Sequence, residues 1–175
     1  LVGFFYRFGI GTNIEYQRAF EMFSLAAANA DINSNDFNNP SLMTMFYTQN
    51  KILGTISLGY LYLYGIGVEK NQKKAFQIFL EAAKEGSSLA ESFLGYCCSE
   101  GYGVEKNEAK AFEYFQISAE KGNIVSLCDI AYSYQKGLGV QKDEKRGFEL
   151  LLQAAEGGSL KAQNSLGICY ENGNG

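Results

Sequence analysis

The sequence contains no histidine, no tryptophan, one proline and four cysteines among its 175 residues. Without histidine, the chain lacks the commonest general base and the commonest protein ligand for metals. Its net charge of −4 disfavours a dedicated nucleic-acid binder, which needs a basic surface. No run approaches the roughly 18 apolar residues that a membrane span requires. These absences argue against a metal site, a nucleic-acid partner and membrane insertion. We also expect no cofactor, no small-molecule substrate and no enzymatic activity, for which the repeat pattern described below is the main reason.

The four cysteines do not suggest a disulfide framework or a metal site. Cys97 and Cys98 are adjacent, Cys128 and Cys169 stand alone, and no CxxC pair exists. We interpret them as reduced thiols that serve as small core residues. Together with the absence of an N-glycosylation sequon, this weakly favours a cytoplasmic location.

Glycine is abundant and follows a strict period. There are 20 glycines, and Gly-x-Gly elements begin 36 residues apart at Gly65, Gly101, Gly137 and Gly173. An earlier copy begins at Gly9, 56 residues before Gly65, which indicates an insertion of 20 residues in the first unit. A fixed period of this length is typical of stacked repeats, in which each unit packs on its neighbours.

Apolar residues within a unit follow helical spacing, as Ala111, Phe112, Phe115 and Ala119 do. Each unit therefore predicts two antiparallel helices. The first, of about 13 residues, begins near Ser88, Asn123 or Ser159. The second, of about 14 residues, begins near Asn71, Asn107 or Asp143, whose side chains can cap it. Small residues (Gly95, Ala131, Ala83 and Ala119) should let the two helices approach closely, and Phe76, Phe79, Phe112 and Phe115 should fill the gap to the next pair.

The Gly-x-Gly elements have two interpretations, of which one is much stronger. A phosphate-binding loop would need a preceding strand and a third glycine or a Gly-Lys-Ser/Thr sequence, and these copies have neither. Glycine readily adopts positive φ, so the elements predict tight turns between helices. Gly147, where the other units have alanine, is expected to weaken its helix by ~1 kcal/mol.

The combined pattern resembles the Sel1-like repeat family. The residues that carry the resemblance are Ala-x-x-x-Leu-Gly-x-x-Tyr, Gly-x-Gly-Val, Lys-Ala-Phe and Ala-Ala-Glu-x-Gly, with the fullest copies at Leu58–Gly86 and Ala90–Gly122. The family is related to tetratricopeptide repeats, and the resemblance implies an all-α, right-handed α/α superhelical solenoid that acts as an adaptor or scaffold for proteins. Cys98 departs from the pattern, because the family has tyrosine there. We expect one array over residues 1–175, of about four units and nine helices or parts of helices, cut from a longer array.

The insertion near residues 32–51 has a polar first part, Asn33–Asn39, followed by Pro40. Proline suits the first position of a helix, so we expect a loop capped by Asn39 and then a first helix that is lengthened at its start. The insertion is interpreted either as a tolerated loop expansion or as a docking segment.

The predicted function is protein or peptide binding in the concave groove of the solenoid. By analogy with tetratricopeptide arrays, the column two residues after each Leu-Gly leucine should face the groove, together with its neighbours. The residues predicted to face the groove are Tyr60, Tyr96, Tyr132, Ile168, Ser92, Cys128, Asn164 and Gln135. The tyrosines could instead pack between neighbouring helix pairs, and the pattern does not decide between these positions.

Two other functions remain open from the sequence. The chain could be a regulatory repeat segment of a larger signalling protein, such as a kinase fusion. Much more weakly, Ser118-Ala119-Glu120-Lys121 matches the Ser-x-x-Lys of penicillin-binding hydrolases. No Ser-Asp-Asn or Lys-Thr-Gly sequence accompanies it.

Overall fold

The structure is a computed structural model that describes residues 14–28 and 40–171, with side chains from residue 48 onward in the second stretch. Within this part of the chain it contains eight helices and no strand. The chain divides into two compact units, residues 1–87 and 88–175, which are described in turn. The predicted turn at Gly173, the loop 33–39 and its cap Asn39 lie outside the described residues.

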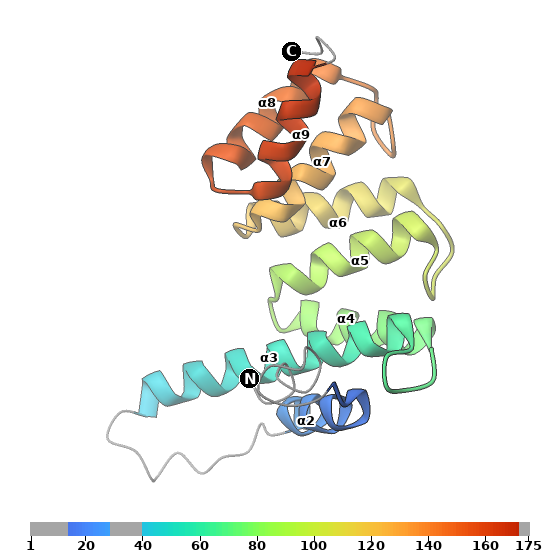
Figure 1. Cartoon of the computed structure of the whole chain (residues 1–175), viewed down its shortest axis with the longest axis vertical. Coiled ribbons are helices and arrows are strands. Elements are labelled where there is room, and N and C mark those ends of the chain that lie inside the picture. The colour runs from blue at the N-terminus through green and yellow to red at the C-terminus, as the bar shows by residue number, and fades with distance from the viewer. Residues whose placement is uncertain (1–13, 29–39, 172–175) are drawn as a thin grey trace. The chain divides into compact units, whose positions relative to one another are not determined.

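The first unit contains α2 (Tyr16–Ala28), α3 (Pro40–Tyr64) and α4 (Gln72–Lys84). Helix α3 packs against both α2 and α4 (Figure 1). It is 25 residues long, whereas the equivalent helix of the next repeat has 13 residues. The predicted lengthening of this helix from Pro40 is therefore confirmed, and proline is suited to this first position because its missing N–H would have no partner within the helix.

The second unit contains α5 (Ser88–Glu100), α6 (Glu108–Glu120), α7 (Ile124–Lys136), α8 (Glu144–Glu156) and α9 (Leu160–Glu171). Each helix packs against the next one along the chain, as Figure 1 shows. We call α3, α5, α7 and α9 the first helices of their repeats, and α2, α4, α6 and α8 the second helices. The predicted starts of these helices are confirmed to within about one residue, which is the usual uncertainty of a helix boundary.

The predicted caps and turns are also confirmed. The side chains of Asn71, Asn107 and Asp143 each accept a hydrogen bond at 2.9 Å from the backbone N–H three residues later. Such a cap stabilises a helix by ~1 kcal/mol because it satisfies an N–H that has no partner within the helix. Six glycines of the Gly-x-Gly turns have positive φ, between 68° and 75°: Gly65, Gly67, Gly101, Gly103, Gly137 and Gly139.

The phenylalanines of α6 pack against two different neighbours, although both were expected from the sequence to pack against the next repeat. Phe112 meets Tyr134 of the next repeat edge to face, with ring centroids 5.4 Å apart, as predicted. Phe115 instead packs within its own repeat, where a Cβ on Gly95 would lie only 2.5 Å from its ring. Three residues turn a helix by about 300°, so the two rings leave α6 on different sides of its buried face.

Gly147 shows why glycine replaces alanine in the last complete second helix. A Cβ at this position would lie 2.8 Å from the backbone oxygen of Ala131 in α7. The weakening of α8 by this glycine stays a prediction, whereas the contact shows that the glycine allows α8 to lie closer to α7 than alanine would.

The cysteines behave as small core residues, as predicted. All four are free; Cys97, Cys98 and Cys128 are buried, and Cys169 is half-buried. Burial raises the pKa of Cys97 to about 12, with a smaller contribution from the neighbouring Cys98. Such a thiol is inert because almost none of it is thiolate near neutral pH.

Candidate interaction surface

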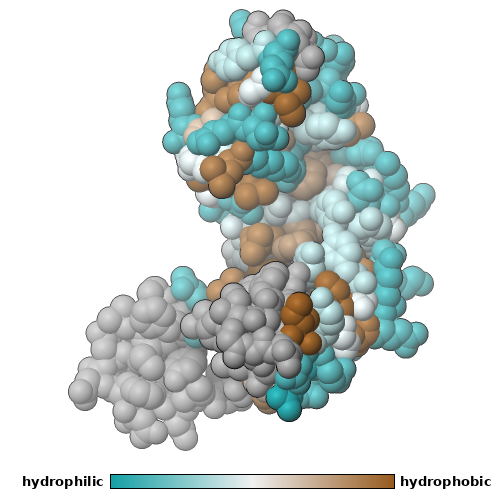
Figure 2. All heavy atoms as spheres, in the orientation of Figure 1, coloured by the Kyte–Doolittle hydropathy of each residue, from teal (hydrophilic) through white to brown (hydrophobic). Residues whose placement is uncertain are grey.

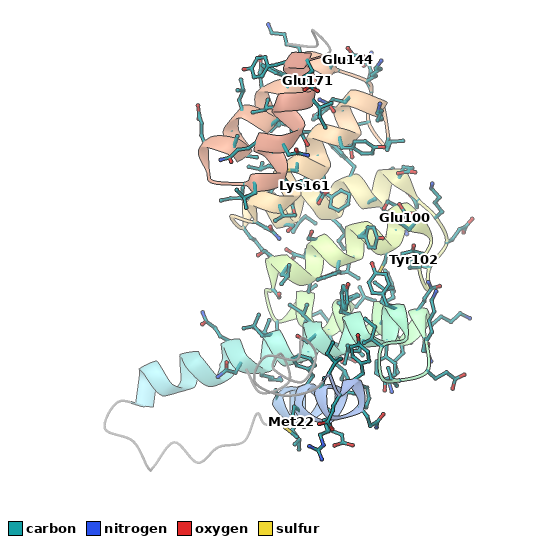
Figure 3. All side chains as sticks on the ribbon, viewed as in Figure 1. Met22, Glu100, Tyr102, Glu144, Lys161 and Glu171 are labelled. Carbon is teal, nitrogen blue, oxygen red and sulfur yellow. The ribbon has the colours of Figure 1, made fainter. Side chains whose placement is uncertain are left out.

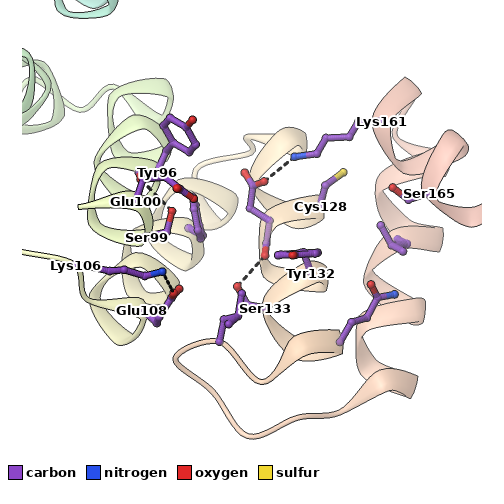
Figure 4. Close-up of a pocket in the computed structure, with 15 residues that line it drawn as sticks. Tyr96, Ser99, Glu100, Lys106, Glu108, Cys128, Tyr132, Ser133, Lys161 and Ser165 are labelled. Atoms are coloured by element: carbon purple, nitrogen blue, oxygen red, sulfur yellow. Dashed lines mark hydrogen bonds and ion pairs between the residues drawn. The ribbon is translucent and has the colours of Figure 1, made fainter. Parts of the chain in front are cut away.

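The second unit contains a cavity of about 530 Å³ that lies entirely among its five helices (Figure 4). Most of its lining comes from the first helices α5, α7 and α9 and from the turns that follow α5 and α7. Phe115 and Leu151 of the second helices contribute apolar surface. The cavity is therefore a product of repetition, because equivalent positions of consecutive repeats are placed beside one another.

Two tyrosines at the same repeat position give the cavity its aromatic surface. Tyr96 on α5 and Tyr132 on α7 are 36 residues apart in sequence and line the same space. Tyr132 is 54% exposed, while Tyr96 is half-buried with its ring 5.5 Å from that of Tyr102. An exposed tyrosine of this kind offers a large rigid contact with a polar tip.

The other residues predicted to face the groove do not all reach this cavity. Cys128 and Gln135 line it together with the two tyrosines. Ser92, Asn164 and Ile168 are in the same unit but do not line it, although Ile168 is 51% exposed. Tyr60 belongs to the first unit, where its ring lies 4.6 Å from that of Tyr64.

Two ion pairs hold charged side chains in the lining. Lys161 of α9 donates to Asp129 of α7 at 2.7 Å, and Lys106 meets Glu108 at 3.0 Å. Burial raises the pKa of Asp129, although its hydrogen bond to Lys161 acts in the opposite direction. The hydrogen bond to Glu108 raises the pKa of Lys106. The pair between Asp129 and Lys161 therefore links two first helices across the cavity.

The charged residues of the cavity lining were not selected from the sequence. Selection of the columns two residues from the repeat leucines, and of their neighbours, passed over Asp129, Lys161 and Ser165. Asp129 and Ser165 occupy one repeat column, 36 residues apart, which is the position after Cys128 and Asn164. The repeat period shows that these two residues are equivalent, but which surface their side chains face depends on how the helices pack.

The Ser-x-x-Lys sequence is built into the core rather than into a site. Ser118 is completely buried, and its hydroxyl donates to the Ser88 carbonyl at 2.6 Å and accepts from Ser126 at 2.8 Å. Lys121 pairs with Glu91 at 2.6 Å. Ser118 therefore ties together α6 and the starts of α5 and α7, and its hydroxyl is not open to a substrate. Among the residues with described side chains, no group of histidine, cysteine or carboxylate side chains could hold a metal ion.

Comparison with known families assigns this architecture. The Sel1 repeat model matches residues 1–31, 54–87, 88–123, 124–159 and 160–175, which leaves out little more than the insertion. The chain belongs to the Sel1 repeat family. Sel1 repeats are generally non-catalytic scaffolds that mediate protein interactions.

Solved structures of Sel1 repeat proteins are similar to this chain. A Sel1 repeat protein from Oxalobacter formigenes is 28% identical, with a TM-score of 0.66 over 97% of this chain and 61% of its own. The protective antigen c5321 of uropathogenic Escherichia coli, which has an SLR fold, is 27% identical, with a TM-score of 0.61 over 98% and 40%. Cysteine-rich protein B of Helicobacter pylori shares the fold at 21% identity, with a TM-score of 0.54 over 86% and 94%. The chain thus spans less than two thirds of the first two proteins, and the predicted all-α solenoid class is confirmed.

Among curated proteins, a search found no match to this sequence. In the part of the chain that the structure describes, none of the helices combines the length and apolar character needed to cross a bilayer.

Proposed function

We propose that this Sel1 repeat chain is a non-catalytic adaptor that binds a segment of a partner protein in the cavity between α5, α7 and α9. The observation that carries this proposal is the position of Tyr132. Tyr132 is 54% exposed although it lies inside the lining of a 530 Å³ cavity, where a bound segment could cover it. Exposed aromatic side chains in concave sites are the usual anchors of protein interfaces.

The polar lining supports a peptide rather than a purely apolar ligand. Ser99, Ser133, Ser165 and Gln135 place hydroxyl and amide groups around the two rings. The hydroxyls of Ser99 and Ser133 already donate to carbonyls of their own helices, yet each oxygen keeps lone pairs that can accept a peptide N–H. An extended segment needs such partners because its backbone groups lose water on binding.

Partner capture by the full chain tests this proposal. The tagged chain is compared with a Tyr96→Ala/Tyr132→Ala variant, and co-purified proteins are quantified by mass spectrometry. We expect the double change to lower the yield of specific partners about tenfold or more, since interface tyrosines often contribute strongly. Ile117→Ala is the matched control, because Ile117 is 41% exposed on α6 and does not line the cavity. Equal capture by all three proteins would refute the proposal.

A further inference from the structure

The charges around the cavity identify the kind of segment that would fit it; this inference rests on the function proposed above. Five charged side chains line the space: Glu100, Lys106, Glu108, Asp129 and Lys161. Both lysines are engaged, Lys106 by Glu108 at 3.0 Å and Lys161 by Asp129 at 2.7 Å. Glu100 therefore leaves the lining with one negative charge in excess.

Glu100 lies at a position that favours a bound cation. It is the last residue of α5, and the C-terminal end of a helix carries partial negative charge that adds to that of the carboxylate. It follows Tyr96 by four residues, so the two side chains lie on one face of the helix. Its charge raises the pKa of Lys106, although less than Glu108 does, and the two groups form no ion pair. Figure 3 shows Glu100 beside Tyr102, at the end of α5.

Tyrosine rings in this chain already serve as cation sites. The ammonium group of Lys74 lies 4.2 Å from the ring centre of Tyr62, and the guanidinium of Arg146 lies 4.8 Å from that of Tyr134. Tyr132 presents an exposed ring to the same cavity that Glu100 lines. A cation over an aromatic face with a carboxylate nearby gains from both the ring quadrupole and the ionic attraction.

We infer that the cavity selects partner segments with a basic side chain, arginine in preference to lysine, whose cation binds the Glu100 carboxylate and the ring of Tyr132. Arginine fits better because its planar guanidinium can stack on a ring and donate two hydrogen bonds to a carboxylate at once. Acidic segments are disfavoured because both lysines of the lining are already paired. The engaged lysines also disfavour nucleic acid, whose phosphates need unpaired cations.

The test is selection of 12-residue segments from a randomised phage-displayed library on the full 175-residue chain. The bound pools from wild type, Glu100→Lys, Tyr96→Ala/Tyr132→Ala and Glu149→Lys are sequenced. Glu149→Lys is the matched control, because Glu149 is an exposed carboxylate of α8 that does not line the cavity. Far-ultraviolet circular dichroism and the urea midpoint confirm that each variant is folded.

We expect arginine and lysine to be enriched about two- to fivefold in the wild-type and Glu149→Lys pools, as for one partly exposed charged contact. The Glu100→Lys pool should lose this enrichment and gain aspartate and glutamate. Glu100→Gln should weaken a selected peptide by a similar factor, and replacing that peptide's arginine with glutamine should remove the difference between the two proteins. Retention of the basic preference and of peptide binding in Glu100→Asp would further support a direct ionic contact.

The possible failures are distinguishable. Segments that need the two tyrosines but show no basic preference, or keep it in Glu100→Lys, would overturn the inference and leave the adaptor function standing. Pools that are the same for wild type and the double tyrosine variant would overturn both.

Discussion

Replacement of Gly139 by alanine tests how neighbouring repeats fit together. Gly139 is the second glycine of its Gly-x-Gly turn and has φ of +69°. A Cβ there would overlap the carbonyl oxygen of Glu108 and lie 2.7 Å from the amide nitrogen of Ala109, in the first turn of α6. This turn therefore fits against the preceding repeat without room for a side chain.

Two other glycines of the same unit separate conformational strain from steric overlap. Gly122 has φ of +86°, and a Cβ there would meet no atom within 4 Å. Gly137 has φ of +71°, and its nearest neighbour would be the Lys142 Cβ at 3.3 Å. All three alanine variants bear the cost of a left-handed backbone conformation, but only Gly139→Ala must also displace the backbone of α6 at Glu108 and Ala109.

The expected magnitudes follow from these contacts. An alanine in the left-handed region costs about 1–2 kcal/mol, which is all that we expect at Gly122 and nearly all at Gly137. Overpacking a tight contact adds about 1–3 kcal/mol, so Gly139→Ala should cost roughly 2–5 kcal/mol in total. Urea unfolding of the full chain, followed by circular dichroism, measures the order Gly139 > Gly137 ≥ Gly122. If Gly139→Ala and Gly122→Ala agree within about 0.5 kcal/mol, the close contact with α6 does not contribute and the reasoning is refuted.

Three further predictions concern the core, a carboxylate and the thiols. Phe112→Ala should lower the free energy of unfolding by about 3–5 kcal/mol, because Phe112 is 8% exposed and packs on Tyr134, whereas Tyr134→Phe should change it much less. Burial raises the pKa of Asp129 in the folded protein above its value in the unfolded chain. The folded wild type is therefore favoured at low pH, where this carboxyl is protonated, and it loses that contribution to its stability as the pH rises through the folded pKa. Asp129→Asn should therefore gain stability relative to wild type as the pH rises from the ordinary aspartate pKa of 3.8 through the raised folded pKa, and a difference in urea unfolding that stays constant with pH would contradict this. The pKa of Cys97 is raised to about 12, so iodoacetamide at about pH 8 should modify half-buried Cys169 first and reach Cys97 only after unfolding, as peptide mass spectrometry would show.

The repeat period was sufficient to predict the local structure. The helix caps at Asn107 and Asp143, the positive φ of the turn glycines and the start of the long α3 at Pro40 all depend on interactions within a few residues. Capping side chains, glycine and proline act over such short distances that the sequence reveals them directly. The order of the helices then follows from the short turns that connect them.

The direction of individual side chains was only partly predictable. Tyr96 and Tyr132 were selected from the sequence and line the cavity, whereas Ser92, Asn164 and Ile168 were selected by the same argument and do not. A column of equivalent residues is defined by the period, but the packing of each helix decides which of its residues reach the cavity: Tyr96 of α5 lines it, whereas Ser92 of the same helix does not.

The sequence by itself determined the helical repeats, their caps and turns, and the family, because these follow from local backbone preferences and a constant spacing. Only the tertiary structure decided which side chains meet: Phe115 against Gly95 in its own repeat, and Asp129 with Lys161 across the cavity. It also decided that Ser118 is buried while Tyr132 is exposed. These outcomes depend on the distance and rotation between packed helices, which are set by many side chains together and are not encoded at any single position.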